Sequence, residues 1–306
     1  MIVPAGLVNC GMNTDILGTF YKTLIVIWKS ITVVLLIASC TGEKAADEDR
    51  VTDQGDSIKK EQISDFWSSY RMATKQRVEG DFKAAINSYR QALAVNGQHE
   101  DAIYYLGNMY LELEQYDEAE KAWEELLLVN PQSSRAHYQL GNLYMQWETS
   151  EYFDLDYAEN EFKKVLEINS DFLQPILLLG QISLMKGKIQ EALNHFSTVI
   201  VSHDRSIEAH LLSAYIFWLQ HDDNKAFSSF ATAVQYSVEE NEKKSHSGEG
   251  DTRGGISLER SLSRSVFTEI IKDLPGAGQE SDAEEMKTVF KKIENLLAEI
   301  KKKGDR

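Results

Sequence analysis

The sequence predicts an all-α fold of five stacked helical hairpins, and three observations carry that prediction. Between residues 100 and 131, apolar and aromatic residues recur three and four positions apart in two runs, which is typical of two amphipathic helices. A polar break at residues 114–115 separates the runs, so the two helices form a hairpin. The pattern returns with a 34-residue period, and because one hairpin cannot bury its apolar faces alone, neighbouring copies must supply the opposite wall.

Small and aromatic residues keep this register along the chain. The small residues of the two helices lie 12 positions apart in four hairpins and 17 apart in the third, which places five extra residues near 147–156. Small residues let helices approach closely. The first-helix positions are Ala73, Gly107, Gly141, Gly180 and Ala214; the second-helix positions are Ala85, Ala119, Ala158, Ala192 and Ala226; aromatic residues follow four positions later at Tyr89, Trp123, Phe162, Phe196 and Phe230.

This region resembles the tetratricopeptide (TPR) repeat, whose period is about 34 residues. The resemblance rests on Leu106, Gly107, Tyr110, Tyr116, Ala119, Trp123 and Pro131. It implies a right-handed α-solenoid over residues 65–240. The expected repeats span about 66–99, 100–133, 134–172, 173–206 and 207–240. Only the second repeat ends in proline, and alanine replaces the first-helix glycine in the first and last repeats.

Residues 1–39 have the layout of a secretory signal peptide. Lys22 and Lys29 precede an apolar run of about ten residues, half of what a membrane span needs, and small residues follow it. Residues 37–40 (Ile-Ala-Ser-Cys) resemble a bacterial lipobox, which implies cleavage before Cys40 and a diacylglyceryl chain on that cysteine. By resemblance to Gram-negative lipoprotein sorting, Thr41 favours the outer membrane. The alternative is an ordinary N-terminal anchor, and Met12 is an alternative start.

Cysteine usage agrees with a lipoprotein. Cleavage would remove Cys10, and lipid would occupy Cys40, so no thiol would remain for a disulfide or a thiolate metal site. Residues 40–64 are polar and acidic, which predicts a flexible tether. An acidic export signal over residues 43–49 is the alternative.

Two further segments follow the predicted repeats. Residues 241–257 are charged and glycine-rich, which predicts a polar linker. Residues 258–306 show helical spacing of apolar residues over 258–274 and again over 281–302. These C-terminal helices either cap the exposed end of the solenoid, as such arrays require, or bind a partner or a second copy.

Charge and motif content limit the function classes. The net charge of −16 disfavours nucleic-acid binding and favours basic or apolar peptide partners. The seven histidines form no metal-binding or nucleophile motif, and we expect His137 and His210 to be packing residues. Asp154 and Asp156 alone offer too few oxygen ligands for calcium. We therefore expect that the protein is not an enzyme and that it binds no cofactor, metal ion or small-molecule substrate.

The TPR resemblance implies a concave groove lined by the first helices. Residues three and four apart, opposite the internal packing stripe, are expected to project into it. Amides there can pair with a peptide backbone, and aromatic neighbours can hold its side chains. The groove residues are Asp101, Tyr104, Asn108, Leu111, Arg135, Tyr138, Asn142, Met145, Gln181, Tyr215 and Trp218, with Leu177, Leu184 and Leu211 beside them. Tyrosines stand where a carboxylate-clamp lysine would be, so a C-terminal carboxylate is not the expected ligand.

These observations predict a membrane-anchored envelope lipoprotein that acts as a TPR adaptor and docks a peptide segment in its groove. One alternative is a structural subunit of an envelope assembly complex, such as a pilus secretin or outer-membrane assembly system, that uses its convex or C-terminal surfaces. A second alternative is a regulator of a periplasmic hydrolase.

Overall fold

The structure is a computed structural model that describes residues 59–146, 152–246, 266–272, 274 and 283–304. The predicted signal peptide, Cys40 and most of the predicted tether and linker lie outside these residues. The chain divides into two units, residues 1–64 and residues 65–306. In the first unit, residues 59–64 are helical. None of the described helices combines the length and the hydropathy that a membrane span needs.

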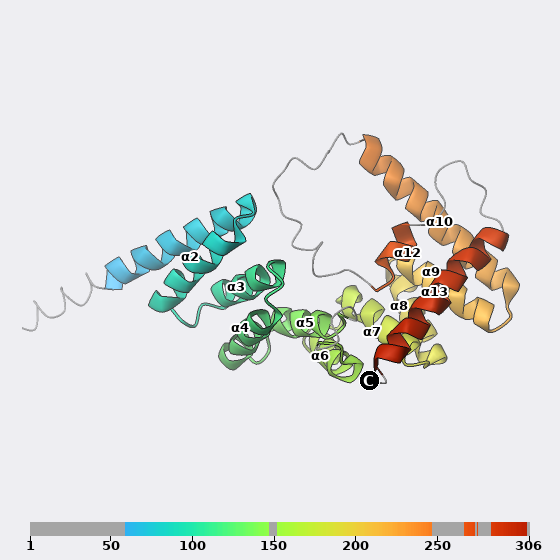
Figure 1. Cartoon of the computed structure of the whole chain (residues 1–306), viewed down its shortest axis with the longest axis horizontal. Helices are drawn as coiled ribbons and strands as arrows, with labels where there is room; N and C mark the ends of the chain where they lie inside the picture. Colours follow the sequence, from blue (N-terminus) through green and yellow to red (C-terminus); the bar gives the residue numbers. More distant parts are fainter. Residues whose placement is uncertain (1–58, 147–151, 247–265, 273, 275–282, 305–306) are drawn as a thin grey trace, which may run out of the picture. The chain divides into compact units, whose positions relative to one another are not determined.

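The second unit is an all-α solenoid of five helical hairpins, as the sequence predicts (Figure 1). In the first hairpin, helical residues 65–79 pack against α2, where Ser88 donates a 2.7 Å hydrogen bond to Gln76. Each second helix then contacts the first helix of the next hairpin. The later helices are α2 (Phe82–Val95), α3 (Glu100–Glu112), α4 (Tyr116–Val129), α5 (Ser134–Leu143), α6 (Leu155–Ile168), α7 (Leu173–Met185), α8 (Ile189–Ser202), α9 (Ile207–Leu219) and α10 (Asp223–His246).

Glycine allows the two helices of a hairpin to meet without a gap. A Cβ atom placed on Gly107 would lie 2.5 Å from the indole Nε1 of Trp123, well inside van der Waals contact. Gly180 has the same relation to the ring of Phe196, also at 2.5 Å. Trp123 and Phe196 are completely buried. In the hairpins that carry this glycine, the predicted pairing of a small residue with an aromatic residue is therefore a close-packed contact between the two helices.

The inserted residues of the third hairpin lengthen its turn, which runs from residue 144 to residue 154. Met145 and Phe153 form an isolated antiparallel bridge across it. The Asp154 carboxylate accepts hydrogen bonds of 2.9 Å from the backbone N–H groups of Asp156 and Tyr157. Asp154 is thus the N-cap of α6, a role that accounts for its carboxylate without a cation.

The C-terminal helices differ in length from the sequence prediction. Helix α10 continues to His246, six residues beyond the expected end of the repeats, because glutamate and lysine favour helix and the first glycine comes only at Gly248. Helix α12 (Thr268–Lys272) covers only part of the expected 258–274 segment, whose residues before 266 lie outside the described structure. Helix α13 (Ala283–Gly304) lies close to the expected 281–302.

Candidate protein-interaction surface

Three predicted groove residues form one network across α3 and α5. The Arg135 guanidinium donates a 2.6 Å hydrogen bond to the carboxylate of Asp101 and lies 4.7 Å from the centre of the Tyr104 ring. Burial alone would lower the pKa of Arg135, but the hydrogen bond and charge of Asp101 outweigh burial and raise it. The structure therefore joins residues from two neighbouring repeats into a charged and aromatic surface that remains partly open to solvent.

Two tyrosines of this surface are held in place by neighbours. Gln139 donates a 3.0 Å hydrogen bond to the Tyr104 hydroxyl, which leaves the hydroxyl hydrogen available for another acceptor. The Tyr138 ring lies 5.3 Å from the ring of Phe172 and 5.9 Å from that of Phe162. Both tyrosines are half-buried. A partner would therefore meet rigid aromatic groups, which lowers the entropy cost of binding.

The amide residues lie deeper than the sequence analysis expects. Asn108 is only 1% exposed, and its side-chain oxygen faces the amide of Gln139 at 3.5 Å. Asn142 donates a 2.9 Å hydrogen bond to the Tyr138 carbonyl of its own helix. Leu111 and Met145 are buried in the core. The expected open row of amide and aliphatic side chains is therefore wrong at these positions, because Asn108, Leu111, Asn142 and Met145 are all buried within the packed hairpins.

The groove residues of the fourth and fifth hairpins are covered by the chain itself. Gln181 is completely buried and donates a 2.6 Å hydrogen bond to Glu208. The ring of Phe290 on α13 lies 5.8 Å from Tyr215 and 5.5 Å from Trp218. Leu177, Leu184 and Leu211 share this buried cluster. The expectation that one open groove spans all these hairpins is therefore wrong, because α13 occupies this part of the first-helix face.

The first hairpin adds two residues that the sequence analysis missed. Tyr70 precedes Tyr104 by 34 residues, and Trp67 precedes Asp101 by the same interval. Trp67 is 45% exposed, and its ring lies 5.7 Å from that of Tyr70. Burial, with a smaller contribution from the charge of Asp101, raises the pKa of Tyr70 to about 12, so its hydroxyl stays neutral. Extending the repeat register one period backwards would have found both residues.

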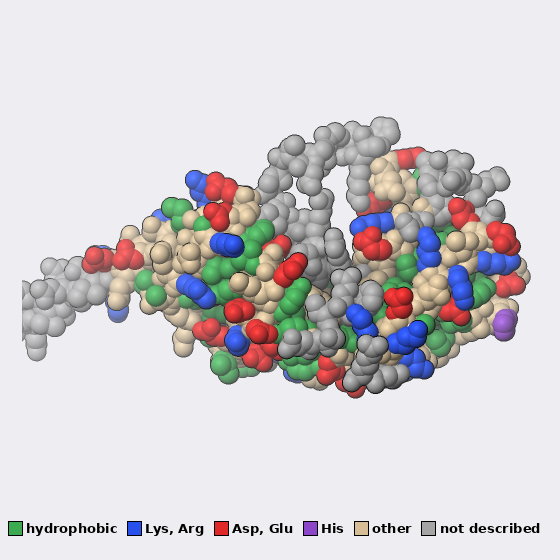
Figure 2. Space-filling model, viewed as in Figure 1, with side chains coloured by type: hydrophobic (Ala, Val, Ile, Leu, Met, Phe, Trp, Pro, Cys, Tyr) green, Lys and Arg blue, Asp and Glu red, His purple; other side chains and the backbone are tan. Residues whose placement is uncertain are grey.

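In Figure 2, hydrophobic side chains reach the visible surface between acidic and basic ones. This face is therefore not uniformly acidic, although the whole chain carries a net charge of −16. At the candidate surface Arg135 is paired with Asp101, so its aromatic and arginine side chains are a more specific feature than the net charge of the chain.

His137 and His210, which the sequence analysis expects to be packing residues, both make polar contacts with neighbouring groups. His137 lies 2.6 Å from the carboxylate of Glu161 and 3.1 Å from the carbonyl of Pro131. His210, two hairpins later, makes the contact that corresponds to the one with Pro131, 2.7 Å from the carbonyl of Asp204. Among the residues that the structure describes, no group of three or more metal-ligating side chains is close enough to hold an ion.

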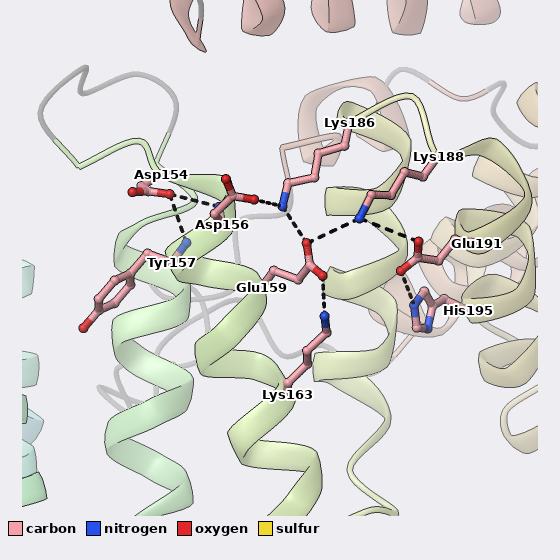
Figure 3. Close-up of polar contacts among 9 residues, drawn as sticks. All are labelled: Asp154, Asp156, Tyr157, Glu159, Lys163, Lys186, Lys188, Glu191 and His195. Atoms are coloured by element: carbon pink, nitrogen blue, oxygen red, sulfur yellow. Dashed lines mark hydrogen bonds and ion pairs between the residues drawn. The ribbon is translucent and has the colours of Figure 1, made fainter.

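A second polar cluster joins the third and fourth hairpins, as Figure 3 shows. The Glu159 carboxylate is bonded by Lys163 and Lys186, each at 2.5 Å, and Lys188 lies 3.9 Å away. Lys186 also reaches Asp156. Burial favours the neutral acid, but the lysines outweigh burial and lower the pKa of Glu159 to about 2. Because Lys186 of the fourth hairpin pairs with both Asp156 and Glu159 of the third, this cluster is a structural clamp between hairpins.

Replacing Glu159 by glutamine is expected to lower the free energy of unfolding at neutral pH by about 1–3 kcal/mol. Because the pKa of Glu159 is lowered in the folded state, its contribution is complete above the unfolded pKa of about 4.3 and is lost as the pH falls towards 2. Urea unfolding of both proteins across this range would measure the difference. A difference that stays constant down to pH 2 would contradict the assignment.

Comparison with known proteins agrees with the architecture. A tetratricopeptide repeat family model matches residues 79–145, from the end of the first hairpin's first helix through the third hairpin's first helix. No curated protein matches the sequence.

Two solved structures are similar to this chain over somewhat more than half of its length. The crystal structure of MamA is 19% identical, with a TM-score of 0.50, and the match covers 56% of this chain and 97% of that one. MamA 41-end from Desulfovibrio magneticus RS-1 is 12% identical, with a TM-score of 0.52 and coverage of 58% and 97%. Identities this low show the fold alone. The described chain is an all-α TPR solenoid, a fold whose extended surfaces bind other proteins.

Proposed function

We propose that this protein is a lipid-anchored adaptor of the bacterial envelope that docks a segment of a partner protein on the first-helix face of its first three hairpins. The observation that carries the docking proposal is the rigid, partly open surface of Tyr104, Arg135 and Tyr138, flanked by Trp67 and Tyr70. Tyrosine, tryptophan and arginine are the residue types that dominate binding energy at protein interfaces.

The docking proposal is tested with the tagged full chain and a Tyr104→Ala/Arg135→Ala variant. We expect the double variant to retain at least tenfold less of the partner captured from envelope extracts, since each anchor contributes about 1–2 kcal/mol or more. Leu128→Ala is the matched control, because Leu128 is 86% exposed on the second helix of the same hairpin. Melting curves must show that all three proteins fold equally.

The outcome also separates the alternatives. Unchanged capture by the double variant would contradict docking on this face. If capture were then lost on changing exposed residues of α4 or α13 instead, the protein would act as a structural subunit through those surfaces. A change in turnover when the purified chain is added to a periplasmic hydrolase would favour the regulator.

The membrane attachment is a separate part of the proposal and rests on the lipobox resemblance at residues 37–40. Acyl chains contribute about 0.8 kcal/mol per buried CH₂, so a triacylated Cys40 would hold the protein firmly at a membrane. Thr41 supports the outer membrane as its location. We expect labelled palmitate to enter the wild-type chain in a Gram-negative host and not the Cys40→Ser variant. Membrane-bound protein without label would favour the ordinary N-terminal anchor.

A further inference from the structure

The first-helix face changes character between the third and fourth hairpins. Tyr104 and Tyr138 are half-buried on α3 and α5, and the equivalent positions on α7 and α9 are Leu177 and Leu211. These leucines are only 6% and 0% exposed. Helices that are apolar all round must be covered on every side. Something must therefore cover the first-helix face of α7 and α9.

Helix α13 provides this cover with a single apolar stripe. Met286, Val289, Phe290 and Ile293 lie in one buried cluster with Leu177, Leu211 and Tyr215. Helix α13 contacts α7 and α10, and in Figure 1 it is the red helix drawn across this end of the solenoid. A Cβ atom on Gly304 would lie 3.8 Å from the ring of Phe153, so the end of α13 reaches the long turn of the third hairpin.

The opposite face of α13 is polar. Lys287 pairs with Glu284 at 2.9 Å, and Lys291 pairs with Glu294 at 2.6 Å, both within the helix. The described contacts of Phe290 with the solenoid are aromatic, to Tyr215, Trp218 and Phe230. Apolar burial is not directional, so any helix with the same stripe can satisfy the same groove. Helix α13 crosses α7 and α10 locally, whereas the two helices of each of the second to fifth hairpins lie along one another.

We propose that the face of α7 and α9 is a helix-binding groove in which α13 is a built-in competitor of an amphipathic helix from a partner protein. That helix would carry apolar residues with the i, i+3, i+4, i+7 spacing of Met286, Val289, Phe290 and Ile293. This second surface is independent of the docking face on the first three hairpins, so either proposal can fail alone. The apparent affinity of a partner is its affinity for the open groove multiplied by the fraction of chains in which α13 has left the groove.

The purified full chain tests this with a labelled peptide of residues 283–304 as the probe. A Phe290→Asp chain is expected to bind the peptide at least tenfold more tightly than the wild-type chain, because its own α13 no longer fills the groove. Lys291→Asp is the matched control on the exposed face of α13 and is expected to bind like wild type. A peptide that itself carries Phe290→Asp is expected not to bind. Failure of the Phe290→Asp chain to bind the unmodified peptide would overturn the proposal.

Hydrogen exchange of the wild-type chain gives a second measurement that does not depend on a variant. Amides of α13 are expected to exchange by a local opening that leaves those of α7 and α9 protected. If α13 exchanges only together with α7 and α9, or if Phe290→Asp unfolds the solenoid, α13 is a permanent cap and no helix-binding groove exists. Dimers formed by exchange of α13 at the assay concentration would also overturn the proposal, since the occupant would then be a second copy.

Discussion

Replacing Trp123 by alanine is expected to lower the free energy of unfolding by about 3–5 kcal/mol, the cost of emptying a site filled by a fully buried aromatic ring. Trp123 is completely buried in α4, and its indole lies directly over Gly107 of α3. Because the backbone of α3 approaches the ring so closely, few side chains are available to collapse into the space. Urea unfolding followed by far-UV circular dichroism measures the loss.

Leu128→Ala provides the control for this prediction on the same helix. Leu128 is 86% exposed, so its truncation is expected to change the free energy of unfolding by no more than about 0.5 kcal/mol. Similar losses for the two variants would show that Trp123 is not the contact that holds this hairpin together. The pairing of small and aromatic residues would then not be a main source of the hairpin's stability.

Replacing Glu161 by alanine is expected to lower the free energy of unfolding by about 2–4 kcal/mol, because it removes the carboxylate partner of the buried His137 and of the partly exposed Lys164. The carboxylate is 2% exposed and bonds His137 at 2.6 Å and Lys164 at 2.7 Å. Burial alone would raise the pKa of Glu161, but these two partners outweigh burial and lower it. The carboxylate therefore joins α5 to α6 in its charged form.

A double variant separates the cost of an orphaned histidine from the cost of lost packing. His137→Leu/Glu161→Leu removes both buried partners and replaces them with apolar volume, so it is expected to be more stable than Glu161→Ala. Thermal melts of the wild type, the single variant and the double variant give the comparison. A single variant as stable as wild type would mean that the pair contributes nothing to the third hairpin.

The hairpin register was predictable because it depends on neighbours close in sequence. The packing of Gly107 against Trp123, and of Gly180 against Phe196, follows from the geometry of two helices joined by a short turn. The repeat also identified Tyr104 and Arg135 as surface positions, and the same register, extended backwards, includes Trp67 and Tyr70.

The sequence analysis did not predict that α13 covers the first-helix face of the fourth and fifth hairpins, although the sequence of those hairpins contains one indication of it. Helices α7 and α9 are apolar almost all round, unlike the amphipathic α5. Such helices require a cover on every face. The sequence of α13 shows an apolar stripe. Such a stripe could pack on any apolar helix face, and the repeat register does not show which face α13 covers.

By itself, the sequence determined the helices, their pairing into hairpins and the close contact of small and aromatic residues within each pair. Only the tertiary structure decided that Asn108 and Gln181 are buried and that α13 lies over Tyr215 and Trp218. The physical reason is that helix formation and hairpin packing depend on residues a few turns apart, whereas the exposure of a surface position depends on whichever distant segment buries the most apolar area against it.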